Sequence, residues 1–188
     1  MESNIYIGLV HHPIYDKRKE VVATAITNFD IHDIARCAKT FGVGGFFIIT
    51  PLESQVQLTE RIIRHWVEGM GSVYNPTRKD SLSLVRISRT IDEADREISN
   101  LWRKKVKRVA TGASPHPKNI DFGPLRRLLK DEESPFFILF GTGWGLTQEV
   151  KNSSDYVLAP IEGKGYNHLS VRSAVAIILD RLLGDRAM

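Results

Sequence analysis

The sequence has little of what builds secreted or membrane-embedded proteins. Its 188 residues include one cysteine, Cys37, so no internal disulfide can form. No Cys/His cluster has zinc-site spacing, and no apolar run approaches the ~20 residues of a membrane span. The first residues also lack a basic region followed by a long apolar core, the pattern of a secretory signal. We therefore expect a cytoplasmic globular protein that uses no metal and no membrane.

The charge is only mildly unbalanced. Lys and Arg number 26 against 22 Asp and Glu, which gives a formal net charge of +4. Such a charge is compatible with an anionic partner but does not by itself indicate one. A chain of this length favours a single domain, which buries roughly 70% of the surface that the unfolded chain exposes.

Short apolar runs alternate with segments of helical periodicity, a pattern typical of an α/β protein. A mainly parallel sheet covered by helices on both faces is therefore expected. Residues 21–26 fit either a strand or an extended lead into the first helix. The segment 52–90 is expected to be a helical insert in this single domain. Strands are predicted at 5–10, 46–50, 84–87, 106–111, 135–140 and 156–159, and helices at 31–41, 55–67, 91–102, 125–129, 168–183 and from Pro76 onward.

Three predicted helices have candidate caps. Asp30 is expected to cap the first helix, and Asn75 the helix that begins at Pro76. Asn167 or His168 is expected to cap the closing helix.

Ligands of parallel sheets bind beyond the carboxyl ends of the strands, and the most distinctive such segment here is 141–145. A buried strand enters it, and glycine at 141, 143 and 145 permits positive φ and close backbone approach to a ligand. The segment lacks both the Gly-Lys-Ser/Thr of a Walker loop and the spacing of a dinucleotide fingerprint. It fits a ligand-binding loop, including one for a phosphate or mononucleotide, or a plain strand-to-helix turn.

Two further strand ends, 111–114 and 159–169, are expected beside that loop. In the second, Pro160, Gly163 and Gly165 predict irregular backbone before the closing helix. Tyr166, Asn167 and His168 would then face the glycine loop. The plain alternative is a helix start with an ordinary cap.

Basic side chains crowd one end of the helix predicted at 91–102. A charge run is usually a solvated face, and RNA binding is the functional alternative. Arg36 lies ~140° from the apolar stripe of its own helix, which also fits a solvated face. The crowded residues are Arg103, Lys104, Lys105, Lys107 and Arg108.

Taken together, three motifs resemble those of the SPOUT superfamily of S-adenosylmethionine (SAM)-dependent RNA methyltransferases, and specifically a small uncharacterised subfamily. The ribose-methylating branch opens with a motif near N-x-x-x-I-x-R-x-A-x-x-F-G. Asp30, Ile34, Arg36, Ala38, Phe41 and Gly42 fall into that motif. The segment 141–147 (GTGWGLT) is similar to the second motif, and 168–174 (HLSVRSA) to the third.

The resemblance implies a C-terminal trefoil knot, a homodimer, and SAM held in the knot by main-chain groups of three loops. The loops are the same three strand ends found above. The cofactor-binding residues it implies are Thr111, Gly112, Ala113, Phe140, Gly141, Thr142, Gly143, Trp144, Gly145, Ile161, Tyr166, Asn167, His168, Leu169 and Ser170.

The resemblance also implies catalytic roles. Arg36 matches the family's catalytic arginine. Because arginine is a poor proton acceptor, we assign it to an RNA phosphate, together with the basic run 103–108. Asp30 and His168 are the proton-acceptor candidates.

The implied substrate is a tRNA or rRNA nucleotide, methylated at the ribose 2′-oxygen or on the base. The catalytic Asp of the guanine-N1 branch has no clear counterpart in this sequence. Gly143 stands where many members have Glu, and Ser170 where Asn is usual. A knotted SAM-binding dimer without methyl transfer, acting as an RNA-binding or sensor protein, is the alternative.

Overall fold

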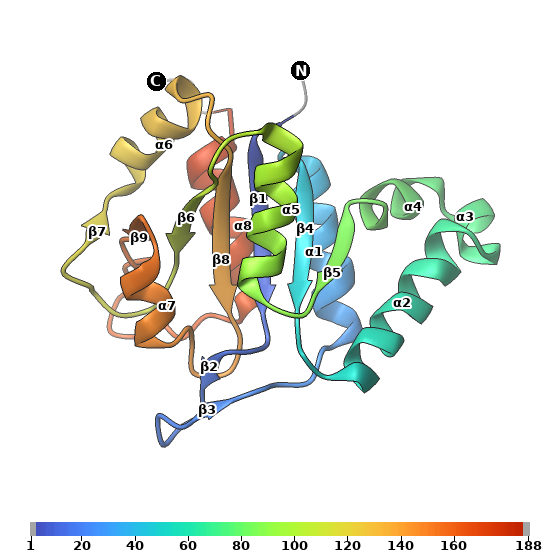
Figure 1. Ribbon diagram of the computed structural model, residues 1–188, viewed down its shortest axis with the longest axis horizontal. Coiled ribbons are helices and arrows are strands. Elements are labelled where there is room, and N and C mark those ends of the chain that lie inside the picture. The colour runs from blue at the N-terminus through green and yellow to red at the C-terminus, as the bar shows by residue number, and fades with distance from the viewer. Residues whose placement is uncertain (1–2, 186–188) are drawn as a thin grey trace.

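Seven parallel strands form the central sheet of the computed structural model, which describes residues 3–185 (Figure 1). Their order is β5-β4-β1-β8-β6-β9-β7. Every pairing between neighbours is parallel, so the predicted mainly parallel sheet is confirmed. The strands are β1 (Ile5–Val10), β4 (Gly45–Ile49), β5 (Val85–Ser88), β6 (Lys107–Ala110), β7 (Asn119–Ile120), β8 (Phe136–Gly141) and β9 (Tyr156–Leu158).

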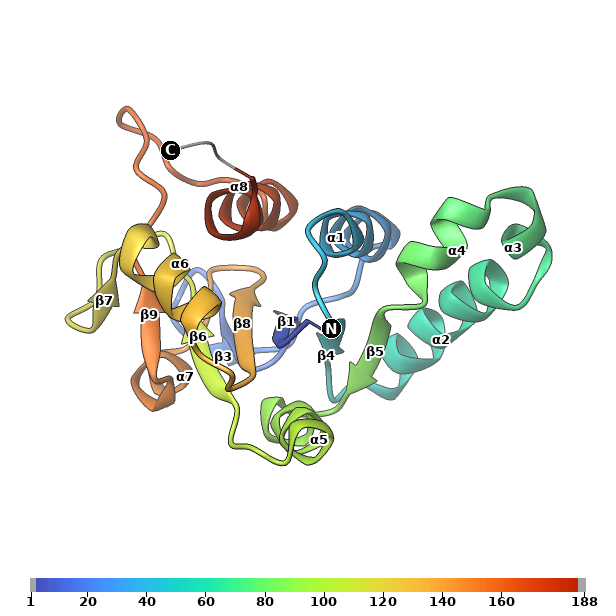
Figure 2. The same ribbon diagram turned by 90° about the horizontal axis from the view of Figure 1, so that it is seen from above.

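Helices cover both faces of the sheet, as predicted (Figure 2). Alternate residues of β1 show the division: Ile5 and Ile7 pack in the core cluster under α1, α6 and α8, whereas Tyr6 packs in the cluster under α5 and α7. The helices are α1 (Asn28–Thr40), α2 (Glu53–Val67), α3 (Met70–Tyr74), α4 (Pro76–Leu82), α5 (Ile91–Trp102), α6 (Phe122–Asp131), α7 (Gln148–Ser153) and α8 (Val171–Leu183).

Two parts of the chain lie outside these layers. Helices α2, α3 and α4 extend away from the β5 edge of the sheet (Figures 1 and 2). A small antiparallel hairpin pairs β2 (Ile14–Tyr15) with β3 (Val21–Val22). Only the first two residues of the segment 21–26 form a strand, and the rest is the extended lead into α1. No helix within residues 3–185 is long and apolar enough to span a bilayer.

Two of the three predicted caps are wrong. α1 begins at Asn28, where the Thr27 side chain accepts the Asp30 N–H, so Asp30 is not the cap. α8 begins at Val171 and is capped by Ser170 rather than by Asn167 or His168. In both cases a hydroxyl residue nearer the true helix start takes the capping position. Asn75 caps α4 as predicted.

Candidate active site

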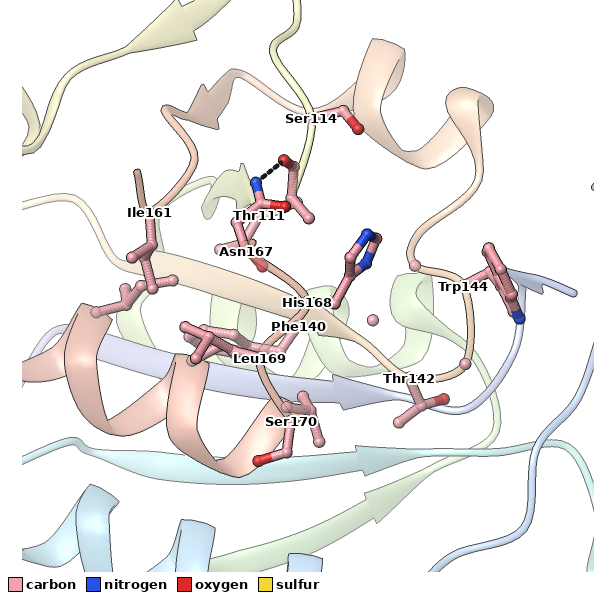
Figure 3. A pocket seen from close by; sticks show the side chains of 18 of the residues that line it. Thr111, Ser114, Phe140, Thr142, Trp144, Ile161, Asn167, His168, Leu169 and Ser170 are labelled. Carbon is pink, nitrogen blue, oxygen red and sulfur yellow. Dashed lines mark hydrogen bonds between the residues drawn. The ribbon is translucent and has the colours of Figure 1, made fainter. Parts of the chain in front are cut away.

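The carboxyl ends of β6, β8 and β9 open onto a pocket of about 830 Å³ (Figure 3). Three loops surround it, and they are the three strand ends that the sequence singled out. Tyr166 is not among its lining residues and is 71% exposed. The predicted cofactor residues that do line the pocket are Thr111, Gly112, Ala113, Phe140, Gly141, Thr142, Gly143, Trp144, Gly145, Ile161, Asn167, His168, Leu169 and Ser170.

The backbone conformation and close packing of the loop 141–145 require its three glycines. Gly143 and Gly145 have φ of +56° and +95°, a region that side chains disfavour. A Cβ on Gly141 would lie 2.5 Å from the Leu146 nitrogen. The β2 hairpin holds the loop in place, because the Tyr15 N–H donates to the Gly145 carbonyl (2.9 Å) and the Trp144 N–H donates to the Tyr15 carbonyl (3.0 Å).

A chain of hydroxyl groups ties this loop to a buried histidine. The Thr142 hydroxyl donates to the Val10 carbonyl (3.0 Å), so the Thr24 hydroxyl must donate to Thr142 Oγ1 (2.6 Å). The proton in the 3.0 Å bond between His11 and Thr24 therefore belongs to His11 Nδ1. This leaves His11 Nε2 as a buried acceptor without a partner among the described residues. Burial lowers the pKa of His11 to about 4, so the ring is neutral at pH 7.

Because the pKa of His11 is lowered, we expect the protein to lose stability in mild acid. The unfolded chain takes up this proton near pH 6.5 and the folded chain near pH 4, so the free energy of unfolding falls as the pH drops between those values. Between pH 7 and pH 5 the protonation of His11 is expected to lower the free energy of unfolding by about 2 kcal/mol. Urea unfolding at both pH values measures it. His11→Asn, whose amide replaces Nδ1 but does not titrate, should show a correspondingly smaller loss, and an equal loss in both proteins would contradict the prediction.

The third loop is held against the first. The Asn167 amide donates to the Ala113 carbonyl (2.7 Å), drawn as the dashed line in Figure 3. The Tyr166 and His168 rings meet edge to face at 5.6 Å between centroids. Tyr166 thus contacts His168 at the rim without lining the pocket. His168 itself lines the pocket and is exposed.

Asp30 supplies a carboxylate to the pocket wall. It is 8% exposed, accepts the Thr27 hydroxyl proton (2.6 Å), and lies 3.4 Å from the Arg172 Nε. Arg172 also donates to Asp33 (2.9 Å), so this arginine joins α8 to α1 through two carboxylates. Only Asp30 of the two carboxylates lines the pocket.

Arg36 lies elsewhere. It is exposed on α1, and it lines a separate depression of about 330 Å³ with Asp33, Cys37, Thr40 and Phe41. Of the three predicted catalytic residues, the structure therefore brings Asp30 and His168 to the pocket and leaves Arg36 outside it.

Ion pairs compensate much of the basic run 103–108. Lys104 pairs with Glu133 (2.8 Å), and Lys107 pairs with Glu132. Arg108 binds both Asp92 and Asp95. The run therefore offers an RNA phosphate much less free charge than its composition indicates.

Sequence reasoning missed Lys151, which lines the pocket from the short helix α7. Its Nζ lies 3.2 Å from the position that a Cβ on Gly112 would occupy. Burial lowers the pKa of Lys151. Thr24 and Ala25, in the lead to α1, also line the pocket. A six-residue helix leaves no periodic signal that could have placed Lys151 here.

The pocket residues fit SAM. Phe140, Ile161 and Leu169 offer apolar surface to an adenine ring, and the three irregular loops offer backbone N–H and C=O groups. Gly112 leaves room that a side chain would fill. Within residues 3–185 no group of three His, Cys, Asp or Glu side chains could hold a metal ion.

Residues 4–184 match the model of a family of SAM-dependent RNA methyltransferases, and the chain belongs to that family. SAM is therefore the cofactor. The resemblance to SAM-dependent RNA methyltransferases seen in the sequence motifs is confirmed.

Two relatives match nearly the whole of this chain but differ in the share of their own length that it covers. A tRNA (guanine-N(1)-)-methyltransferase of Oleidesulfovibrio alaskensis is 45% identical over 183 residues, which is 97% of this chain and 42% of that protein. An uncharacterized protein of Aquifex aeolicus is 38% identical over 97% of this chain and 89% of its own length. The chain spans about two fifths of the length of the first relative.

Solved structures share the fold. A probable methylase family protein of Haemophilus influenzae has a TM-score of 0.64 at 19% identity, covering 97% of this chain and 66% of that one. The Aquifex aeolicus TrmH/SpoU tRNA modifying enzyme has a TM-score of 0.56 at 15% identity, covering 97% and 74%. The SpoU methyltransferase AviRb of Streptomyces viridochromogenes, solved with AdoMet, has a TM-score of 0.55 at 16% identity, covering 97% and 60%. The trefoil knot remains a prediction.

Proposed function

We propose that this chain methylates a nucleotide of tRNA in the pocket between the three loops, with Asp30 as the proton acceptor. The observation that carries the proposal is the buried Asp30 carboxylate in the wall of a pocket whose loops hold the second and third family motifs. A relative that covers 97% of this chain carries the name of a tRNA methyltransferase, which supports tRNA as the RNA.

The guanine-N1 specificity of that name belongs to a protein more than twice as long as this chain. The sequence here has no clear counterpart of the catalytic Asp of the guanine-N1 branch. We therefore propose tRNA methylation without carrying over the target atom, and the experiment below distinguishes base from ribose.

The chain's own residues divide the work of methyl transfer. When bound, SAM supplies an electrophilic methyl group. The loops would hold the acceptor ~3–3.5 Å from that methyl group. Asp30 accepts the acceptor's proton, because its ionised form has oxygen lone pairs in the pocket wall and Arg172 beside it. His168, at the rim, is the second candidate for this role.

In a homodimer, Arg36 could contact RNA bound at the pocket of the partner copy. Phe29, on the outer face of α1, is 67% exposed, with the Arg172 guanidinium 5.5 Å from its ring centre. We propose that a second copy covers this outer face of α1 and α8, so that Arg36 of one copy holds RNA near the pocket of the other. Sedimentation of the purified chain as two copies would support this, and a monomer would contradict it.

Nucleoside mass spectrometry tests the proposed function. tRNA from cells that lack the protein should be short of one methylated nucleoside, and the purified chain with SAM should restore it. Resistance of the adjacent phosphodiester to alkali assigns the ribose 2′-oxygen, and sensitivity assigns the base. Unchanged nucleosides in both tRNA and rRNA would contradict the proposal, and a change in rRNA alone would contradict tRNA as the substrate.

A further inference from the structure

Two arginines that form no ion pair among residues 3–185 lie where α1, α2 and α4 meet. We call the group formed by His32, Arg36, Trp66 and Arg78 the insert cluster. The Arg78 guanidinium lies 4.4 Å from the centre of the Trp66 ring. The His32 ring meets the same indole edge to face at 5.5 Å. Helices α1, α2 and α4 thus bring two arginines and one indole near the His32 ring.

The electrostatics of the cluster show that its charge is not neutralised internally. Burial lowers the pKa of His32, and the positive charges of Arg78 and Arg36 lower it further, against the opposing effect of Asp33. Asp33 is itself paired with Arg172. Neither Arg36 nor Arg78 forms an ion pair with any residue between 3 and 185. His32 Nδ1 is also buried without a hydrogen-bond partner among those residues.

The basic run 103–108 offers a direct contrast. Three of its side chains are held by carboxylates, whereas the two arginines of the insert cluster have none. An anion at the cluster meets arginines that no carboxylate neutralises, whereas only Arg103 and Lys105 of the run are unpaired among residues 3–185. An RNA backbone is the anion that a methyltransferase of this family meets, and arginine binds phosphate through a planar pair of N–H donors.

The geometry points to the insert cluster as an RNA docking surface, on which Arg36 and Arg78 bind backbone phosphates while Trp66 holds Arg78 in place. This inference rests on the proposed function, since RNA must be the substrate. It assigns RNA contact to α4, outside all three family motifs. The adjoining tip of α3 carries Tyr74, which is 87% exposed and available for an unstacked base.

RNA binding as a function of salt tests the surface. Fluorescence anisotropy with labelled tRNA compares the wild-type chain with Arg78→Gln and Arg36→Gln. Each variant is expected to bind about 5- to 10-fold more weakly and to lower the slope of log affinity against log salt by about 0.7 to 0.9, the loss of one phosphate contact. Arg78→Lys, which keeps the charge, should keep most of the slope.

Two charge-matched variants serve as controls. Lys130→Gln, at an exposed site on α6, should keep the affinity within about twofold. Lys105→Gln tests the competing basic run. A wild-type slope in Arg78→Gln, or a larger loss in Lys105→Gln, would overturn the inference while leaving the proposed function intact.

Two further outcomes separate the remaining explanations. Calorimetric SAM binding by Arg78→Gln should equal that of the wild type, because the cluster lies outside the pocket. A loss of SAM binding together with RNA binding would mean that Arg78 is needed for the fold, which overturns its role in docking. If the wild-type chain binds no RNA at any salt concentration, both the proposed function and the docking surface are wrong.

Discussion

Replacing Gly163 with alanine is expected to lower the affinity for SAM by more than about tenfold, a cost above about 1.4 kcal/mol. A Cβ on Gly163 would lie under 3.0 Å from the carbonyl oxygen of Tyr166, which is backbone and cannot rotate away. The loop 159–170 must therefore rearrange. That loop supplies Asn167, His168 and Leu169 to the pocket. Isothermal titration calorimetry with SAM measures the loss.

The fold itself should change little in this variant. The loop is largely exposed, and the core clusters lie beneath the sheet-covering helices. Gly123→Ala is the matched control, because its Cβ would meet nothing nearer than Arg127 at 3.9 Å and it lies in helix α6. Full SAM affinity in Gly163→Ala, with an unchanged melting temperature, would contradict the assignment of this loop to the cofactor.

Asp30→Asn is expected to lower the single-turnover rate of methyl transfer by about 10²- to 10⁴-fold, the usual effect of removing a general base. The amide keeps the shape of the carboxylate, but it cannot take up the proton. Arg172 retains Asp33 as a partner at 2.9 Å, so the packing of α8 against α1 should survive. SAM affinity should stay near the wild-type value, because the change does not touch the three loops.

Asp33→Asn separates catalysis from structure. Asp33 binds the same Arg172 but does not line the pocket. Its loss should leave the rate within a few-fold of the wild type. Equal losses in the two variants would show that Asp30 acts only by anchoring Arg172. A normal rate in Asp30→Asn would move the role of proton acceptor to His168.

The parts of the fold that the sequence predicted are those with long, uniform signals. β1, β4 and β8 are nearly continuous apolar runs, and each forms a buried central strand close to its expected bounds. The two-residue strand β7 and the short helices α3 and α7 carry no comparable periodicity. The strand order depends on pairings between distant segments, such as β1 with β8, which local patterns do not contain.

The pocket was predictable because strand ends of a parallel sheet and the family motifs indicate the same three loops. The capping prediction for Asp30 was wrong because Thr27, three residues earlier, is also a good cap. That correction matters for function, because the Asp30 carboxylate lines the pocket, where it accepts the Thr27 hydroxyl proton and pairs with Arg172.

Charge compensation was not predictable from composition. The partners of the basic run come from other elements: Arg108 meets Asp92 on α5, and Lys107 meets Glu132 beyond α6. The insert cluster likewise joins α1, α2 and α4, with β4 and α3 between them in the sequence. Such pairings follow from the tertiary fold alone.

The most direct test of the account is transfer of label from methyl-labelled SAM to bulk tRNA by the purified chain. We predict incorporation into the RNA that depends on the chain and falls to background in Asp30→Asn while SAM binding persists. SAM binding by the wild-type chain without any label in tRNA or rRNA would contradict methyl transfer. It would instead support the alternative of a SAM-binding protein that senses or binds RNA.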